Sequence, residues 1–417
     1  KFMDFSNDWM DEFKLRFSLG QTGNSASGAS LYLGSYASGN NYMDMSAITP
    51  SSMQLNKLKW ETTTEYNTGL DATFLKGKLR FTVDVYQKYV KDLLQPKVKM
   101  PTTIGYGNGY QISYMNSGKM TNKGWEFRVD AVPFQNKDWR VGVYFNIAHN
   151  ENKITEMPDN YIEENYTFGN GNYAYRREEG RPMGSFYGYR YKGVYQNKDA
   201  TYARDIEGNV MKDISGNAIV MRNGSYTVAP GDAIYEDVNH DGVINQYDIV
   251  YLGNSNPRLT GGAGLNVSYK QFKLSAIFYG RYGQDVVNAT RLNNESMRGI
   301  DNQSTAVLRR WRNEGDQTDI PRALYGEGYN TLGSDRFVED ASYLRLKSLS
   351  FTYRLPKKAI QRWGFNNIDV YVTGYNLFTW TKYTGQDPEV KTENTYARDT
   401  ATTPASIQLV AGFNLSF

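Results

Sequence analysis

The 417-residue sequence predicts an all-β fold: a transmembrane antiparallel β-barrel to which residues 1–417 contribute about ten strands joined by long extracellular loops. Three observations predict it. Several segments alternate apolar and polar residues with a period of two. Short and long connections follow one another in strict order. The final segment alternates up to a terminal aromatic residue, Phe417.

The alternation marks the strands. In 79–86 the odd positions are apolar and the even positions polar or amphipathic, and 125–131, 139–147 and 368–373 repeat this. Because residues i and i+2 of a strand share a face, each segment has one apolar and one polar face. The predicted strands are 12–19, 57–74, 78–90, 123–134, 138–150, 260–270, 272–283, 342–354, 367–379 and 405–417.

The connection lengths distinguish a membrane barrel from a soluble β-sandwich. Tight turns at 76–77, 135–137 and 270–271, and a longer one at 356–366, alternate with long segments. Compact soluble domains rarely use loops beyond ~12–15 residues, whereas outer-membrane barrels have short periplasmic turns and long extracellular loops. This parity predicts a multi-pass protein of the bacterial outer membrane with a periplasmic C-terminus. The long segments are 20–56, 91–122, 151–259, 284–341 and 380–404.

Aromatic residues and one phase change refine the prediction. Tryptophans at positions 60, 125, 139 and 380 fall near predicted strand ends, as in the aromatic girdles of membrane barrels. In 342–354, Leu344 and Leu346 share one face, whereas Leu349 and Phe351 occupy the other. A β-bulge near 347–348 would restore the register.

Composition removes several other classes of protein. The chain has no Cys, which excludes disulfides and thiolate chemistry. It has only two His, too few for most histidine-based catalytic sites, and no enzyme is predicted. The formal net charge of +3, from 47 Lys and Arg against 44 Asp and Glu, gives no basic surface for nucleic acid. No apolar run reaches the ~18–20 residues of a transmembrane helix, which barrel strands do not need.

Residues 237–248 match a calcium-binding loop at its key offsets. Gly242 stands where such a loop turns sharply, and position 12 is Asp rather than the usual Glu, as in dockerin-like loops. The segment therefore predicts calcium or a similar hard cation at the base of the loop 151–259, and a turn without an ion is the alternative. The predicted ligands are Asp237, Asn239, Asp241, Asn245 and Asp248, with the backbone carbonyl of Val243.

Charged residues on the polar strand faces form a second group of candidates. Asp84 and Asp130 are expected to face the barrel lumen among Arg80, Arg128 and Arg140. They would tune the lumen for a passing solute, or simply form a solvated wall.

A family resemblance rests on segments that span nearly the whole chain. The chain resembles the C-terminal half of a SusC/RagA-type TonB-dependent transporter. Each matching segment is weak evidence alone, but the whole set in the family's order is specific. The matching segments are 13–24, 58–61, 66–71, 122–126, 184–189, 342–346, 355–356, 376–378 and 383–389.

The resemblance implies a barrel of about 22 strands around a plug. It also implies that the N-terminal plug, the TonB-contacting segment and the first strands lie outside this chain. The partners implied are TonB, the remainder of the same barrel, membrane lipid and a SusD-like surface lipoprotein that caps the mouth. Two transporter–lid pairs commonly assemble in this family.

The function expected is TonB-dependent import of an oligosaccharide or an oligopeptide. Tyr rings stack on sugars and serve peptides equally, so tyrosines of the long loops are the expected ligand contacts. They are Tyr106, Tyr110, Tyr161, Tyr173, Tyr175, Tyr325 and Tyr329. One alternative is a secreted, soluble β-rich binding protein braced by a dockerin-like calcium loop. Another, a barrel-borne lipase or protease, lacks the histidines for a catalytic triad.

Overall fold

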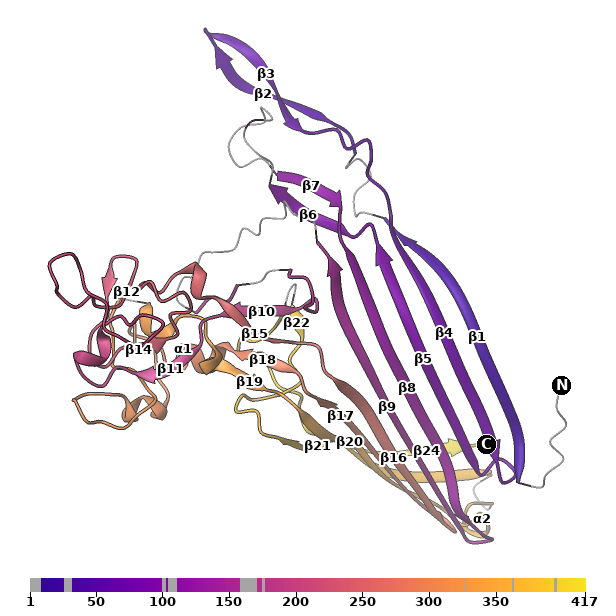
Figure 1. Ribbon diagram of the computed structural model, residues 1–417. Helices are drawn as coiled ribbons and strands as arrows, with labels where there is room; N and C mark the ends of the chain where they lie inside the picture. The colour runs from indigo at the N-terminus through magenta and orange to yellow at the C-terminus, as the bar shows by residue number, and fades with distance from the viewer. Residues whose placement is uncertain are drawn as a thin grey trace.

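A long, curved β-sheet carries a separate mass of folded loops at one end (Figure 1). The computed structural model describes residues 9–25, 32–99, 103, 111–157, 171–174, 177–326, 328–361, 364–393 and 396–417. No helix within these ranges is both long enough and apolar enough to cross a membrane.

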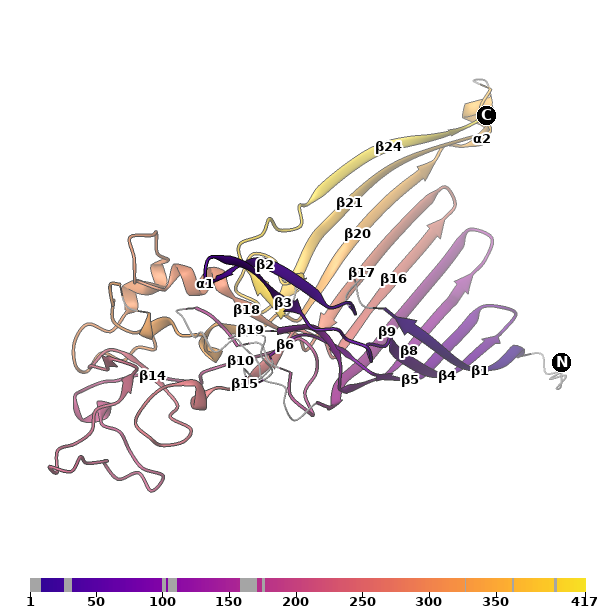
Figure 2. The same cartoon turned by 90° about the horizontal axis from the view of Figure 1, so that it is seen from above.

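The sheet contains ten antiparallel strands whose spatial order is their order in the sequence. Seen from above, it follows a wide arc, with β1 and β24 at its two ends (Figure 2). All ten predicted strands are present, so this prediction is confirmed. The strands are β1 (Met10–Asn24), β4 (Glu61–Phe74), β5 (Leu79–Lys91), β8 (Lys119–Gln135), β9 (Trp139–Glu156), β16 (Leu259–Tyr269), β17 (Phe272–Tyr282), β20 (Tyr343–Arg354), β21 (Asn367–Thr381) and β24 (Gln408–Ser416).

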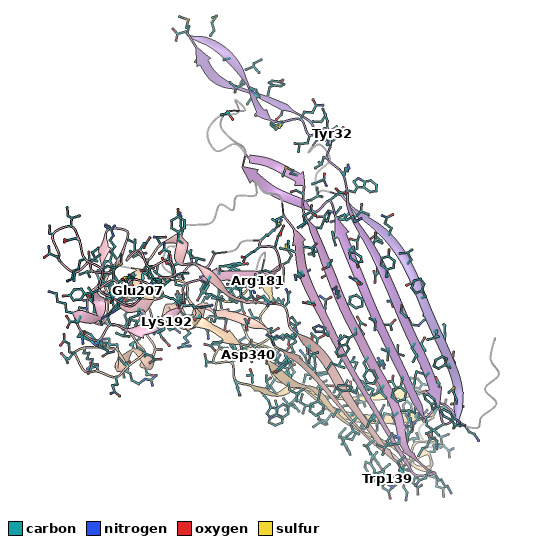
Figure 3. The ribbon with its side chains drawn as sticks, viewed as in Figure 1. Tyr32, Trp139, Arg181, Lys192, Glu207 and Asp340 are labelled. Carbon is teal, nitrogen blue, oxygen red and sulfur yellow. The ribbon has the colours of Figure 1, made fainter. Side chains whose placement is uncertain are left out.

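Short turns close one end of the sheet and long connections leave the other. Trp139 lies at the turn end, and Tyr32 lies beyond the opposite end (Figure 3). Lys76 and Lys270 have positive φ values of 57° and 50° in their tight turns. The longer turn between β20 and β21 contains α2 (Lys357–Ile360). The first two long connections form hairpins, β2 (Ser35–Tyr42) with β3 (Met45–Ser52), and β6 (Leu94–Lys99) with β7 (Gln111–Asn116).

The other three long connections fold together beside the rim. The connection between β9 and β16 contains β10 (Ser185–Gly188), β11 (Tyr191–Val194), η2 (Asp199–Thr201), β12 (Arg222–Asn223), β13 (Tyr226–Thr227), β14 (Ala233–Tyr235), η3 (Gln246–Asp248) and β15 (Val250–Asn254). The next contains β18 (Asp285–Asn288), α1 (Ala289–Asn294), η4 (Thr305–Arg309), η5 (Tyr329–Thr331), η6 (Asp335–Phe337) and β19 (Val338–Asp340). The last contains β22 (Thr392–Glu393) and β23 (Tyr396–Asp399).

These connections have apolar cores of their own. Tyr187, Tyr189 and Tyr235 are buried in the largest core, together with aliphatic residues from several short strands. A second core surrounds Phe186 and Phe337, both fully buried. Strands β18 and β23 pair in parallel, which joins the connection before β20 to the connection before β24. These three long connections are therefore one folded unit, which is called the loop unit below.

The register separates an apolar face from a polar face across the whole sheet. Arg16, Gly69, Asp84 and Glu126 lie in one row across four strands. The neighbouring row on the opposite face contains Phe17, which is 74% exposed. A continuous exposed apolar face is the outer wall expected of a membrane barrel, and the polar face is then the lumen wall.

The predicted phase change in β20 is a β-bulge. The register against β21 shifts between Leu346 and Ser348, and the register against β17 shifts at the same place. Against β17, Lys347 is an extra residue of β20, whereas against β21 the extra residue belongs to β21. Leu346 and Leu349 therefore both reach the apolar face although three positions separate them, and the prediction is confirmed.

Tyrosine side chains on the polar face cover glycines of neighbouring strands. Tyr144 lies across Gly264, and Tyr86 lies across Gly124 in the same way, so that a Cβ added at either glycine would overlap the ring. The glycine supplies the gap that the ring fills, which locks adjacent strands in register.

We expect Gly264→Ala to displace Tyr144 and to reduce the fraction of correctly assembled barrel. The control is Gly142→Ala on the neighbouring strand, where the nearest atoms are 4.0 Å from an added Cβ. Heat-modifiable electrophoretic mobility of the membrane-extracted protein measures the assembled fraction. Equal assembly of the two variants would contradict the role assigned to the Tyr144 ring.

Candidate functional site

The loop that resembles a calcium site is closed by its own hydrogen bonds. The Gly242 N–H donates to Asp237 Oδ2 at 2.8 Å, and the Val243 N–H donates to Asp241 Oδ1 at 2.8 Å. Gly242 has a φ of 79° and provides the sharp turn that the sequence predicted. Asn239 donates to the second oxygen of Asp241 at 3.0 Å, so the side chains at positions 1, 3 and 5 converge on this turn.

Asp248 points into the protein as a brace. It is fully buried, and its two oxygens accept the backbone N–H groups of Val238 and Asn245, each at 2.8 Å. Asn245 in turn accepts the Tyr247 N–H at 2.8 Å, so Asn245 and Asp248 form a capping box around η3. Burial raises the pKa of the Asp248 carboxyl although both backbone bonds oppose that shift. The Asn-x-x-Asp spacing was the signal in the sequence for this role.

The arrangement fits calcium in the type of oxygen donor at positions 1, 3 and 5 but not at position 12. No three His, Cys, Asp or Glu side chains within the described ranges are grouped so that they could hold a metal ion. Asp248 was expected to complete the calcium coordination shell at position 12, but both of its carboxylate oxygens accept backbone N–H groups. Calcium binding therefore stays a prediction, and no functional step below depends on it.

The tyrosines predicted to contact ligand separate into three groups. Tyr173 and Tyr329 are only 7% and 3% exposed, so their predicted place at loop tips is wrong. Each ring fills a core that the long loops build for themselves, and the Tyr173 hydroxyl donates to the Ser334 carbonyl at 2.7 Å. Tyr325 is 77% exposed and is open to a ligand. Tyr106, Tyr110, Tyr161 and Tyr175 lie outside the described residues.

A hollow of about 480 Å³ lies mainly on the polar face of β5, β8, β9, β16 and β17. Asp84, Glu126 and Arg128 line it, and the side-chain oxygen of Asn146 is buried there without a hydrogen-bond partner in the described part of the chain. Gly262 opposite leaves room for these side chains. The hollow can therefore accept a donor group from a molecule inside the barrel.

The charges predicted on the polar face are present and mostly paired. Asp130 pairs with Arg128 at 2.7 Å, within the group of neighbours that the sequence indicated. Asp84 pairs instead with Arg16 at 2.9 Å, and Asp71 binds the same guanidinium at 2.7 Å. Sequence reasoning missed Arg16, because its strand is adjacent to Asp71 and Asp84 only in the folded sheet.

Arg345 ties the last long connection to the sheet wall. Its side chain is 3% exposed and pairs with Asp387 at 2.5 Å and Glu389 at 2.9 Å, and it donates to Thr379 Oγ1 at 2.9 Å. Lys347, the bulge residue, also pairs with Glu389 at 2.9 Å. Two of the segments on which the family resemblance rests, 342–346 and 383–389, therefore meet in this ion-pair cluster.

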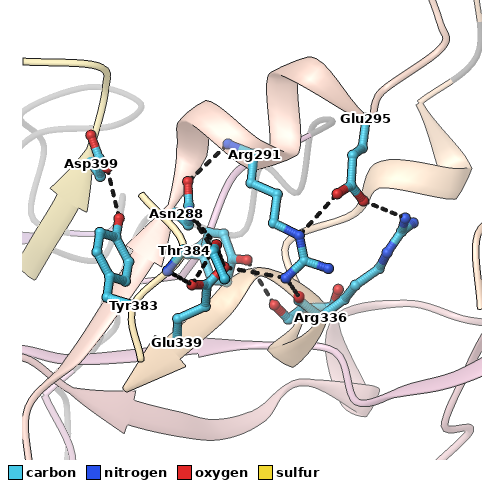
Figure 4. A network of polar contacts seen from close by, with 10 residues as sticks. Asn288, Arg291, Glu295, Arg336, Glu339, Tyr383, Thr384 and Asp399 are labelled. Carbon is cyan, nitrogen blue, oxygen red and sulfur yellow. Dashed lines mark hydrogen bonds and ion pairs between the residues drawn. The ribbon is translucent and has the colours of Figure 1, made fainter. Parts of the chain in front are cut away.

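A second polar cluster joins α1 to the neighbouring loop segments (Figure 4). Glu295 accepts from Arg291 at 2.9 Å and from Arg336 at 2.8 Å. Glu339 accepts from Arg291 at 3.2 Å and from the Thr384 backbone N–H at 2.9 Å. The cluster spans the connections before β20 and before β24.

A third ion pair links the two largest connections. Arg322 binds the fully buried Asp232 at 2.7 Å, and Tyr226 and Asn330 donate to the same carboxylate. Asp232 is thus fully satisfied, which a buried carboxylate requires. Together the three clusters fix the long loops to each other and to the rim of the sheet.

Comparison with known proteins identifies the family. The model of the TonB dependent receptor-like β-barrel matches residues 4–377. The chain is 29% identical over 425 residues to the TonB-dependent receptor SusC of Bacteroides thetaiotaomicron, across 98% of this chain. The solved structure of the RagAB peptide transporter superposes on 99% of the chain with a TM-score of 0.75 and 27% identity. The chain belongs to the SusC/RagA family of TonB-dependent transporters.

This membership excludes the two alternatives from the sequence. The family consists of outer-membrane β-barrel transporters, so a soluble calcium-braced binding protein and a barrel-borne enzyme are both ruled out. Another relative, TonB-dependent receptor P3 of Formosa agariphila, is 32% identical over 346 residues, across 81% of this chain. The chain spans 32% of the length of that relative, 38% of SusC and 42% of the RagAB chain.

We expect Asp248→Ala to expose the backbone of 237–248. Two part-buried N–H groups lose their acceptor, which costs about 1 kcal/mol each, the low end of the range for buried groups. Hydrogen exchange read by mass spectrometry should show faster exchange in 237–248 with and without added calcium. Asp199→Ala, an exposed residue of the same connection, is the matched control. Protection that is lost only in the presence of a chelator would favour calcium over the hydrogen-bond brace.

We expect Arg345→Met to loosen the segment 382–405. Breaking a fully buried ion pair costs about 3–5 kcal/mol, and the partial exposure of Asp387 and Glu389 reduces this to about 2–3 kcal/mol. Exchange of the backbone amides in 382–405 should accelerate by a factor of about 30 or more. Arg354→Met removes an exposed pair with Asp369 at the turn end and should leave the segment unchanged.

Proposed function

We propose that this chain forms part of a transporter that imports an oligosaccharide or an oligopeptide across the outer membrane, with energy delivered by TonB. The observation that carries the proposal is the pairing of two features. The sheet presents a polar, charge-bearing inner face, and three of the five long connections fold as one braced unit at a single rim. Such a unit presents a fixed surface to a ligand before it enters the barrel.

The open edges of the sheet support a larger barrel. Within the described strands, β1 pairs only with β4 and β24 pairs only with β21. Lipid does not tolerate unpaired strand edges, so we propose that further strands of the same barrel cover both. The relatives and the RagAB chain, which are more than twice as long as this chain, have room for those strands.

The partner we propose is a SusD-like surface lipoprotein that closes over the loop end. In this proposal the loops lie outside the cell, the short turns and Phe417 lie in the periplasm, and two transporter–lid pairs form one assembly. Its support is the family, together with the exposed Tyr325 on the loop unit. TonB would act through a plug segment outside residues 1–417.

The test uses the complete transporter and its co-purifying lipoprotein, extracted from the outer membrane in detergent. Denaturation should release a bound oligomer that mass spectrometry assigns to peptides or to glycans. Uptake of that oligomer should require TonB, so cells that lack TonB should accumulate none above the background of cells that lack the transporter. Uptake that continues without TonB would overturn the proposal. If the transporter purifies without any lipoprotein, the proposed SusD-like partner is contradicted.

A further inference from the structure

A groove of about 700 Å³ opens on the apolar face of the sheet, near its loop end. It crosses β9, β16, β17, β20 and β21. Phe145, Ile147, Ala263, Phe278, Leu344 and Trp380 are among its lining residues. This face is the outer wall, opposite the face that carries Asp84 and Glu126, so in the barrel the groove opens toward lipid.

The register explains why the groove exists. One row across five strands reads Ile147, Gly261, Gly280, Leu344 and Trp380. The two adjacent glycines place no side chain between Ile147 and Leu344. A Cβ at Gly261 would overlap the Asn146 carbonyl, and one at Gly280 would approach the Tyr343 carbonyl at 2.7 Å. Close strand packing therefore keeps this gap open.

The next row limits the groove on the side away from the loops. It reads Phe145, Ala263, Phe278 and Leu346. The small side chain of Ala263 extends the gap into this second row, and the ring of Phe278 on the next strand closes one side of it. The recess is thus one side chain deep, with apolar walls on both sides, and it would fill with hydrocarbon in a bilayer.

The loop end of the groove has a different character. Tyr282 and Trp380 are 60% and 52% exposed, as expected of residues at the membrane interface. Lys382 lines the groove two residues beyond Trp380, and no ion pair involves it within the described residues. Asp340, labelled at the junction of sheet and loops in Figure 3, accepts the Ser342 N–H at 2.8 Å and also its hydroxyl. Both donors are neutral, so Asp340 keeps its negative charge, but its Oδ1 is engaged by Ser342. Lys382 is the lining lysine at this end and is available to an anion.

We propose that this groove is a binding site for a phosphorylated glycolipid of the outer leaflet. One acyl chain lies along the recess over Gly261 and Gly280, and a phosphate lies on Lys382. The position of the cation at the interface, directly beyond the apolar recess, matches a lipid with an anionic head and an apolar tail. The choice of leaflet rests on the proposed function, which places the loop end outside the cell.

Native mass spectrometry of the complete, delipidated transporter tests the site. The probes are lipid A, its dephosphorylated form and phosphatidylethanolamine. Lipid A should bind with one high-affinity site per barrel. A lysine near an anionic headgroup is worth about a fivefold change in affinity, so Lys382→Gln should weaken lipid A by about fivefold and leave dephosphorylated lipid unchanged. Ala263→Phe should fill the recess and abolish the site.

Two matched controls separate the groove from general lipid contact. Lys357→Gln changes a lysine at the turn end, and Ala411→Phe changes an alanine on the same apolar face of β24, away from the groove. Neither should change lipid A binding. Because Lys382 is exposed, its substitution does not threaten folding even if Ala263→Phe impairs assembly.

Four outcomes would overturn the proposal. The first three are equal affinity for phosphorylated and dephosphorylated lipid, equal effects of the control variants, and, as the third, a shift of oligomeric state with Ala263→Phe in place of a loss of lipid. This third outcome would assign the groove to a second copy of the transporter. Since binding is measured without transport, failure of import leaves this result intact. Preference for phosphatidylethanolamine would overturn the inference and leave import standing.

Discussion

Every part of this molecule depends on the pairing of backbone groups between neighbouring strands. In lipid, an N–H or C=O without a partner costs several kcal/mol, so a spanning sheet cannot tolerate a break. Strands β4 to β21 are paired on both sides. The extra residue of β20 against β17, and that of β21 against β20, are absorbed as bulges without interrupting the sheet. The tyrosine rings over Gly264 and Gly124 support this pairing, because they fix the register and so determine which backbone groups hydrogen-bond to each other.

The loop unit follows a different principle, because water surrounds it and the sheet gives it only a base. Its geometry comes from buried carboxylates with several donors each. Asp232 and Glu295 are the clearest cases, at 0% and 6% exposure. Exposed ion pairs contribute little, whereas buried ones permit few alternative arrangements. Arg345 extends this principle onto the sheet, since its guanidinium is held between the wall and the last connection. Backbone pairing holds the sheet together as one wall, and the buried ion pairs fix where the long loops lie on it.

The two principles explain what the sequence could predict. The number of strands, the bulge and the placement of long and short connections all follow from patterns within a few residues, and all were predicted. Four strands, β1, β8, β9 and β21, proved longer at the loop end, because pairing persists beyond the apolar band that marks a strand in sequence. The sequence also placed Asp84 on the polar face but could not find its partner Arg16, 68 residues away.

The loop interior could not be predicted for the same physical reason. Tyr173 and Tyr329 carry no periodic signal, and their burial depends on cores assembled from distant segments. Asp248 matched the offset of a metal ligand, but its oxygens are taken by backbone donors whose position is set by the fold of the turn. Arg345 and Asp387, 42 residues apart, lie in segments that resembled the family separately, and nothing in either segment indicates the contact.

The sequential order of the strands has a consequence for how such a chain can change over evolutionary time. Each strand joins a neighbour by closing a single loop, and the entropy of closure grows only with the logarithm of loop length. The connection of about 100 residues between β9 and β16 therefore costs only about 3 kcal/mol more to close than a four-residue turn. The burial of apolar side chains in one additional core is enough to offset that free-energy difference. A sheet with this topology can acquire or exchange large inserted domains at one rim while the folding of the wall remains almost unaffected.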